Sequence, residues 1–256
     1  MRVVVVLRLV PDLTEELEID ESGTDIDREW IGIKLNEFDD HALEEAVLLK
    51  EGSGATVTAL ALDGEGVDRM LQSAIARGAD AAVKVEHGME HIPDQRTAAA
   101  ILAGAIKELG ADLILTGVQT PEDVFGQLAP FLAAHLDMPT VNAVGGVSAD
   151  GDNAVDVRQE YSGGMSAILG VTLPAVLGIQ TASQPPRYVS GSKLRQAMSA
   201  EIATLSGADA GAATGAEITG LQEPERGDGA TMFDGDAETV AGKIVDVLNE
   251  RGLLGG

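Results

Sequence analysis

Residues 116–130, TGVQTPEDVFGQLAP, place two side-chain amides, two acids and a glycine directly after an apolar run. The run itself, ADLILTG at 111–117, is typical of a buried strand, and a helical pattern begins near Gly126. Glycine lets the backbone approach a ligand closely, and the N–H groups of Gln127 and Leu128 would open a helix whose dipole favours an anion. This turn is therefore a candidate phosphate site of a nucleotide-binding protein.

The two acids of this turn leave a second interpretation open. Glu122 and Asp123 would repel a phosphate unless backbone amides or a bridging ion intervene. They can instead cap the following helix, in which case the stretch is an ordinary loop between a strand and a helix. Spacing alone does not separate the two interpretations.

Three other stretches have the same character: LRLVPD (7–12), ALDGEG (61–66) and the loop before NEFDD (36–40). Each combines small or flexible residues with the start of an expected helix, as a phosphate or adenine pocket needs. In an open parallel sheet, ligands bind at the carboxyl ends of the strands where the strand order reverses. We therefore expect the four stretches to meet at one edge of a sheet.

Other chemistries lack their motifs. No G-x-G-x-x-G follows the first apolar run, and no Walker lysine loop occurs. SGGMS at 162–166 is interpreted as a glycine turn rather than a phosphate loop. HGMEH at 87–91 is expected to be a loop rather than a pair of metal ligands, because Gly88 and Ile92-Pro93 disfavour a helix. No nucleophile lies beside an evident base, so we expect the chain not to be an enzyme by itself.

The charge balance, 42 acids against 17 bases, gives a formal net charge of -25 and argues against nucleic acid as a partner. The acids are spread along the chain, which favours a folded protein with an acidic shell, as suits high salt. There is no cysteine, and no apolar run of the signal-peptide type or of membrane-spanning length. We expect a soluble, cytoplasmic protein from a halophile, without membrane insertion.

The elements that must position the candidate site alternate along the first half of the chain. Strands are expected at 3–10, 55–62, 81–86 and 111–117, and helices at 36–52, 67–78, 97–110 and 126–136. Asp39 or Asp40 is the expected N-cap of the first helix, and Gly52 its end. The alternation predicts an α/β fold with a Rossmann-like, doubly wound and mostly parallel sheet.

After Pro139 the pattern changes to strand-like segments joined by glycine-rich turns, which we expect to extend the sheet with antiparallel strands. A helix is expected near 192–199, an extended arm at 205–230 and a final amphipathic helix at 236–252. The predicted organisation is a nucleotide-binding domain at 1–204 and a C-terminal arm with its helix at 205–256.

Several motifs occur in a fixed order along the chain. They are VVLRLVPD (5–12), NEFD (36–39), ALEEA (42–46), VTALALDGEG (57–66), AIARGADAAVKV (74–85), DLILTGVQTPEDVFGQLAP (112–130), EYSGG (160–164), LPAVL (173–177) and PRY (186–188). In this order and spacing they resemble the beta subunit of electron transfer flavoproteins.

The resemblance implies a subunit that pairs with an alpha subunit carrying a redox-active FAD. It implies a structurally bound AMP in this chain or, as in electron-bifurcating members that use NADH, a second FAD in the same place. The implied redox partners are acyl-CoA or other flavin dehydrogenases and a membrane quinone reductase. The C-terminal arm and helix would wrap the alpha subunit, or else pack on their own domain.

Carried over by position, the resemblance implies two sets of site residues. The nucleotide phosphate would lie on the backbone around Gly126, Gln127 and Leu128 with Asp123 or Glu122 nearby. The residues at the adenine end would be Leu9, Asn36, Ala61, Leu62 and Asp63, and Gln119 would be a further cofactor-binding residue. A recognition segment for partner dehydrogenases would include Pro186, Arg187, Tyr188, Gly191 and Leu194.

The chain departs from the usual pattern of the family at a few of these positions. Arg8 replaces a lysine, Glu37 replaces the proline of Asn-Pro-Phe, and Gln159 stands where arginine is common. Gly191 falls at the position of an apolar anchor, so either Leu194 substitutes for the anchor or the partner docks differently. A stand-alone ATP-binding module of the universal-stress type is a further alternative, but its phosphate loop does not follow residues 116–130.

Overall fold

The structure is a computed structural model that describes residues 1–89, 93–123, 125–151, 153–207, 218–225, 227 and 229–254. The chain divides into two units, Met1–Thr219 and Gly220–Gly256. The boundary predicted between 204 and 205 stays a prediction.

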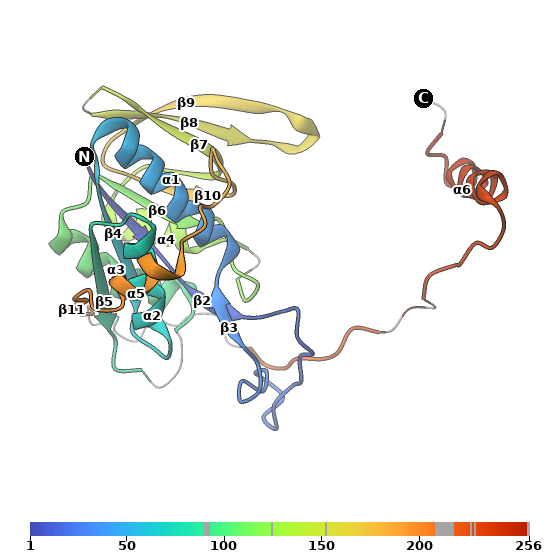
Figure 1. The fold of residues 1–256 in the computed structure, drawn as a ribbon, viewed down its shortest axis with the longest axis horizontal. Coiled ribbons are helices and arrows are strands. Elements are labelled where there is room, and N and C mark those ends of the chain that lie inside the picture. Colours follow the sequence, from blue (N-terminus) through green and yellow to red (C-terminus); the bar gives the residue numbers. More distant parts are fainter. Residues whose placement is uncertain are drawn as a thin grey trace. The chain divides into compact units, whose positions relative to one another are not determined.

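The first unit is built on a nine-stranded sheet with the order β11-β5-β4-β1-β6-β10-β7-β8-β9 (Figure 1). Its parallel centre comprises β1 (Arg2–Val6), β4 (Thr56–Leu62), β5 (Ala81–Glu86), β6 (Leu113–Gly117), β10 (Ala175–Ile179) and β11 (Ala203–Ser206). Val5 of β1 lies opposite Ala59 of β4 and Leu115 of β6. The predicted parallel sheet is thus confirmed.

Helices cover both faces of this sheet. They are α1 (Glu37–Ser53), α2 (Val67–Arg77), α3 (Gln95–Leu109), α4 (Leu128–Leu136) and the short α5 (Gly191–Ala197). Val3 and Val5 pack in one core cluster with residues of α1 and α2, whereas Val4 and Val6 pack in a second cluster with α3 and α4. Because successive side chains of a strand point to opposite faces, the unbroken valine run of β1 serves both layers.

The strand predicted at 3–10 is two strands. β1 ends at Val6, and β2 (Leu9–Pro11) leaves the sheet to pair antiparallel with β3 (Ile33–Leu35). The break falls at Arg8, whose backbone N–H donates to Asp39 rather than to a neighbouring strand. Local apolar character could not show this, because the competing acceptor lies on another element.

The boundaries of α1 differ from the predicted ones. Asn36, not Asp39 or Asp40, occupies the N-cap position, and no side chain caps the helix there. The helix passes through Gly52 and ends at Ser53, because Gly54 adopts the left-handed conformation (φ 72°) that closes a helix.

Beyond Pro139, the expected antiparallel extension is confirmed for β7 (Thr140–Asp150), β8 (Ala154–Glu160) and β9 (Ser166–Thr172). SGG at Ser162–Gly164 is the turn between β8 and β9. For β10 the expectation is wrong: this strand inserts in parallel between β6 and β7. All of its residues are buried, as is usual for a central strand covered on both faces.

The second unit contains α6 (Ala237–Glu250), which matches the predicted final helix. Asp236 caps it, since its Oδ1 accepts a hydrogen bond from the backbone N–H of Thr239 at 2.9 Å. No residue of α6 is buried. None of the helices in the described ranges is long and apolar enough to cross a membrane.

Candidate functional site

The strand order reverses between β1 and β6. From β1 the chain moves outward through β4 and β5, and it then returns to β6 on the other side of β1. The carboxyl ends of β1 and β6 therefore flank the point where ligands bind in open α/β sheets. Arg8 follows β1 and Gly117 ends β6 at this edge.

Asp39 joins these two strand ends. Its side chain is fully buried and comes from the first turn of α1. Oδ2 accepts from the backbone N and Nε of Arg8 at 2.9 and 3.0 Å, and Oδ1 accepts from Nη2 of Arg8 at 2.7 Å and from the backbone N of Gly117 at 2.8 Å. A Cβ at position 117 would collide with the carboxylate, so this close approach requires glycine. We call these three residues the Asp39 lock.

Asn36 and Gln119, both predicted to bind cofactor, lie together beside the Asp39 lock. The Nδ2 of Asn36 donates to the carbonyl oxygen of Gln119 at 2.9 Å, and its backbone N donates to the carbonyl oxygen of Arg8 at the same distance. The carboxamide donor is thus engaged in holding the loop after β6 against the start of α1. This contact makes Asn36 a support of the candidate site.

The 117–127 turn is closed by its own side chains. Thr120 Oγ1 accepts from the backbone N of Asp123 at 3.0 Å, and Asp123 Oδ2 accepts from the backbone N of Gln127 at 3.0 Å. Gly126 has φ 63°, and a Cβ there would collide with the carbonyl oxygen of Val118. Asp123 therefore shapes the loop and occupies an amide that the sequence assigned to a phosphate.

The amide groups left at the start of α4 are few. The first N–H groups of a helix have no acceptor within that helix. Leu128 and Ala129 provide two such groups, but Pro130 has none, and Phe131 already donates to the carbonyl oxygen of Gln127 at 3.0 Å. An anion at this helix end would thus meet Leu128 and Ala129 before Gln127.

Glu122, the other acid of the turn, is neutralised by a distant arginine. Nη2 of Arg28 lies 2.5 Å from Oε1 of Glu122 and 3.1 Å from Oδ1 of Asp25. Burial would lower the pKa of Arg28, but its hydrogen bonds to Asp25 and Glu122 raise it overall. The bond ties the segment between β2 and β3 to the candidate site.

The expected adenine-end residues surround the same edge. Ala61 and Leu62 end β4 beside β1, and the side chain of Leu9 lies against the turn that follows. A Cβ on Gly66 of that turn would be 3.3 Å from Cδ1 of Leu9. The carbonyl oxygen of Asp63 is 3.0 Å from Nε2 of His87. The structure thus brings the predicted cofactor-binding residues together, while their contact with a nucleotide stays a prediction.

One donor at this edge has no partner in the described part of the chain. Nη1 of Arg8 is buried and unpaired, although the rest of the guanidinium bonds Asp39 and the carbonyl oxygen of Gly117. An unmet charged donor is costly in a protein interior, and a ligand with acceptor atoms would remove that cost. The unpaired donor fits a nucleotide, which carries many oxygen and nitrogen acceptors.

Of the predicted recognition residues, Arg187 contacts the middle of α1, away from the Asp39 lock. The guanidinium of Arg187 pairs with Glu44 at 2.8 Å and with Glu51 at 2.7 Å, and its backbone N donates to Glu44 at 2.9 Å. Glu45 accepts from Ser183 through both the backbone N, at 2.7 Å, and the hydroxyl, at 2.9 Å. We call this arrangement the strap clamp, and residues 182–187 the strap.

The other members of the recognition set differ in exposure. Tyr188, directly after the strap, is 92% exposed, and Pro186 is half-buried. Gly191 begins α5 and is exposed, and Leu194 is half-buried. Arg187 itself is engaged in the strap clamp, so it positions the segment rather than offering a free guanidinium.

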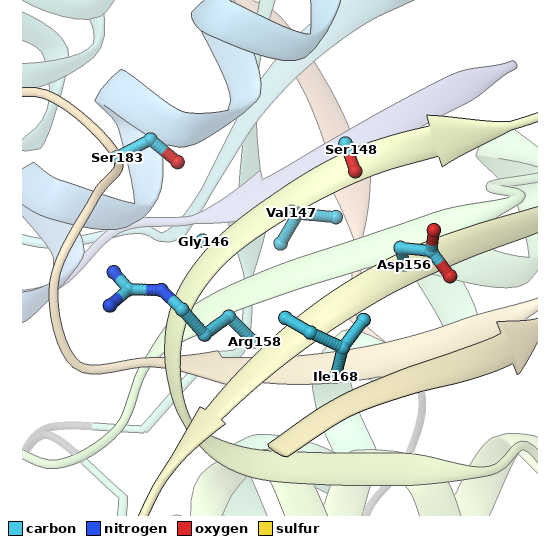
Figure 2. A pocket seen from close by; sticks show the side chains of 7 residues that line it. All are labelled: Gly146, Val147, Ser148, Asp156, Arg158, Ile168 and Ser183. Atoms are coloured by element: carbon cyan, nitrogen blue, oxygen red, sulfur yellow. The ribbon is translucent and has the colours of Figure 1, made fainter. Parts of the chain in front are cut away.

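A hollow of about 380 Å³ lies on the antiparallel extension, lined by Gly146, Val147, Ser148, Asp156, Arg158, Ile168 and Ser183. Figure 2 shows the guanidinium of Arg158 directed to the same side as Ser183 and the carboxylate of Asp156 directed away from it. Arg158 pairs with Glu160 at 3.2 Å and donates to the carbonyl oxygen of Gly145. Its charge is already balanced, which argues against an anion site.

Sequence reasoning did not assign site roles to Asp39, Glu44 and Glu45. A signal was present, because Asp39 falls at helical spacing with the buried Leu43 and Ala46 and so had to point inward. Among the described residues, no group of three or more acidic or histidine side chains could hold a metal ion, and the expected absence of a metal site stays a prediction. His91 of the HGMEH stretch lies outside the described residues.

The family model of the electron transfer flavoprotein domain matches residues 25–210. The chain is 32% identical to a Methylophilus methylotrophus protein described as electron transfer flavoprotein subunit beta, over 98% of each chain. It is 35% identical to a Bacillus subtilis protein of the same description, over 69% of this chain and 68% of the relative. It is 29% identical to the Caffeyl-CoA reductase-Etf complex subunit CarD of Acetobacterium woodii, over 99% of this chain and the full length of the relative.

A family model that covers most of the chain and relatives aligned over nearly its full length agree with the motif order in the sequence. The chain therefore belongs to the electron transfer flavoprotein family, as a member of its beta-subunit branch.

Proposed function

We propose that this chain is the beta subunit of a heterodimer, in which it binds AMP structurally and the alpha subunit holds the FAD that accepts and donates electrons. The observation that carries the AMP assignment is the turn at 117–127. There the start of α4 and the unpaired Nη1 of Arg8 lie along the edge at which the strand order reverses.

In this proposal the phosphate binds the N–H groups of Leu128 and Ala129 at the positive end of α4. The Gln127 amide joins them only when Asp123 releases it. Leu9, Ala61, Leu62 and Asp63 line the adenine end. The Asp39 lock holds the two strand ends at a fixed separation, while Asn36 holds Gln119 in place.

Nucleotide analysis tests the proposal directly. The chain is co-purified with its alpha subunit, and ligands released by heat are separated by chromatography. We expect one FAD and one AMP per heterodimer. A stable monomer that carries neither nucleotide would contradict the proposal.

A matched pair of glycine variants assigns the AMP to the 117–127 turn. Gly126→Ala should release AMP, because alanine meets both the left-handed backbone and the Val118 carbonyl oxygen. Gly151→Ala imposes a similar backbone cost at φ 66°, in a turn with no described atom within 4 Å of the new Cβ. It should retain one AMP. Equal AMP loss in both variants would remove the assignment.

A second FAD in place of AMP is the alternative, and one observation favours it. A relative aligned over nearly the whole chain is a subunit of a complex named for caffeyl-CoA reductase and Etf. Two FAD and no AMP per heterodimer, together with reduction by NADH, would establish this alternative. A single FAD per heterodimer would exclude this alternative, since AMP and a second FAD would occupy the same edge of the sheet.

The strap and the residues after it form the proposed docking segment for acyl-CoA or other flavin dehydrogenases, with a membrane quinone reductase as the final acceptor. The strap clamp supports this, because it fixes Arg187 and leaves the next side chain, Tyr188, exposed. Tyr188→Ala should slow reduction by a dehydrogenase without changing the AMP content. Unchanged reduction rates with every dehydrogenase tried would remove Tyr188 from the docking segment.

The C-terminal arm and helix at 205–256 would contact the alpha subunit. The amphipathic pattern of α6 supports this role, since its apolar side chains need cover. Truncation before residue 220 should weaken the heterodimer while leaving the sheet of the first unit folded, and circular dichroism can check that folding. A truncated chain that pairs as tightly as the full one would restrict the interface to the first unit.

A further inference from the structure

The segment between β2 and β3 carries an unusual set of exposed apolar side chains. Trp30 is the single tryptophan of a chain with seven aromatic residues, and it is 81% exposed. Other large apolar side chains on or beside this segment are also exposed: Leu13, Leu17, Ile19 and Ile33. Several large apolar side chains exposed within one short segment indicate a surface that another molecule covers.

Beside Trp30 lies a small hollow of about 130 Å³, lined by Glu16, Glu18, Asp27, Trp30 and Ile31. None of its three carboxylates has a cationic side chain within 4 Å in the described part of the chain. Nearby acids differ in this respect, because Asp12 pairs with Lys34 and Asp25 pairs with Arg28. The hollow therefore combines an indole with negative charge that the chain itself does not balance.

The chemistry of the hollow selects an organic cation. A metal ion needs three or more ligand atoms at one point, and the described residues contain no such group of acids and histidines. Carboxylates spread around an indole suit a larger, delocalised charge instead. A guanidinium stacks on the face of tryptophan and donates to several carboxylates at once, which an ammonium does less well.

We propose that the segment between β2 and β3 docks the alpha subunit of the heterodimer through an arginine side chain that enters the hollow beside Trp30. This inference rests on the proposed heterodimer and adds the surface and the chemistry of its contact. Exposed tryptophan surface is unfavourable in water, so it fits a permanent partner better than one that binds and leaves.

The position of the segment supports the same occupant. Arg28 bonds Glu122 in the candidate nucleotide site at 2.5 Å, and Ile33 lies against Gly66 in the turn after β4. The docking surface is thus continuous with the edge where the cofactor chemistry is proposed. The strap clamp holds a separate segment on α1, so the two kinds of partner would not compete for one surface.

The single tryptophan makes the test local. The chain is labelled with 5-fluorotryptophan and assembled with an unlabelled alpha subunit, so that Trp30 alone gives a fluorine resonance. If the indole is covered, the resonance in the heterodimer should show almost no shift between water and deuterium oxide, and acrylamide should quench its fluorescence poorly. A full solvent-isotope shift in an intact heterodimer would overturn the inference and leave the heterodimer itself standing. Failure to assemble would overturn both.

Charge variants test the arginine. Neutralising the hollow with Glu16→Gln, Glu18→Gln and Asp27→Asn should speed heterodimer dissociation about tenfold, and Trp30→Ala should have at least that effect. The control neutralises three exposed acids elsewhere, Glu108→Gln, Asp137→Asn and Glu201→Gln, with the same change in net charge. It should change dissociation less than twofold. Equal effects of the two triple variants would show general electrostatics instead, and would also overturn the inference.

Discussion

Helix α1 carries buried acids near its start and along its middle, and the two sets hold different parts of the chain. Asp39 binds Arg8, which follows β1, and Gly117, which ends β6, and these two strands are already paired within the sheet. Glu44 and Glu45 bind the strap, which follows β10. Asp39 therefore adjusts the carboxyl edge of two strands that pair without it, whereas Glu44 and Glu45 fix the strap to the surface of α1. Buried acids of α1 thus position two strand ends near the start of the helix and attach the strap near its middle.

The largest effect should come from Asp39→Asn. The change removes the only carboxylate that bonds the buried guanidinium of Arg8 in the described structure, and breaking a buried ion pair costs about 3–5 kcal/mol. Urea unfolding should show this loss. The control is Asp112→Asn, because Asp112 pairs with the exposed Arg2 at 3.7 Å, where pairs contribute about 0–1 kcal/mol. A loss below about 1 kcal/mol for Asp39→Asn would deny the Asp39 lock its structural role.

Glu45→Gln should have the next largest effect. Both oxygens of Glu45 accept hydrogen bonds, from Val147 at 2.6 Å and from Ser183 at 2.7 and 2.9 Å. An amide in its place turns one acceptor into a donor that faces a donor, at a cost of about 2 kcal/mol. Hydrogen exchange should speed up at the amides of Val147 and Ser183 but not at that of Gly117. Uniform acceleration would mean that the two sets of acids act as one unit.

Glu44→Gln should cost less, about 1–2 kcal/mol, because Arg187 keeps Glu51 as a partner and is partly exposed. Its effect should instead appear in function. A loosened strap would slow electron transfer from a dehydrogenase, while the AMP content of the heterodimer stays at one. Loss of AMP in this variant would show that the strap clamp and the Asp39 lock are coupled.

The smallest effect is a dependence on pH. The hydrogen bond from Arg187 lowers the pKa of Glu51 below its ordinary 4.5, against the opposing effect of burial. The stabilisation is therefore complete above about pH 4.5 and is lost as the pH falls through the folded-state pKa. Hydrogen exchange in the strap should rise over this window in the native chain. In Glu51→Gln the hydrogen-exchange rate of the strap, corrected for its intrinsic pH dependence, should not change over this pH range. A rise in this variant would show that another acid is responsible.

A second acid provides the contrast in pH. Lys34 and the hydroxyl and backbone N–H of Thr14 lower the pKa of Asp12, from 3.8 to about 2. Its contribution to the β2–β3 pair is present above about pH 3.8 and disappears as the pH falls toward 2. The contribution of Glu51 should thus begin to weaken below about pH 4.5, and that of Asp12 below about pH 3.8.

Much of the fold follows from local patterns. The strand at ATVTALAL and the helix expected at 97–110 are recognisable from their own sequences, and this helix ends at Leu109, where Gly110 adopts the left-handed conformation. Two features depend on distant partners instead. Arg8 breaks the first strand because its backbone amide donates to Asp39. β10 lies inside the sheet because it pairs with β6 on one side and with β7 on the other. Neither partner is visible from the segment itself.

The candidate site divides in the same way. The 116–130 turn is recognisable from its glycine, its acids and the strand before it, and these residues do lie at the edge where the strand order reverses. The sequence does not predict which polar group of the turn bonds which partner. Asp123 takes the Gln127 amide, and Arg28 reaches Glu122 across 94 positions of sequence. Only the folded structure shows which polar groups form the hydrogen bonds that hold the loop.

The central position of β10 also fixes an order of assembly. β6 and β7 precede it in the chain, yet in the sheet they are joined only through β10. During synthesis, β6 therefore keeps one edge unpaired until Ile179 has emerged, and an open apolar edge is prone to pair with other chains. The strap follows within a few residues and binds α1, so closure of the sheet and attachment of the strap come as consecutive late steps of folding.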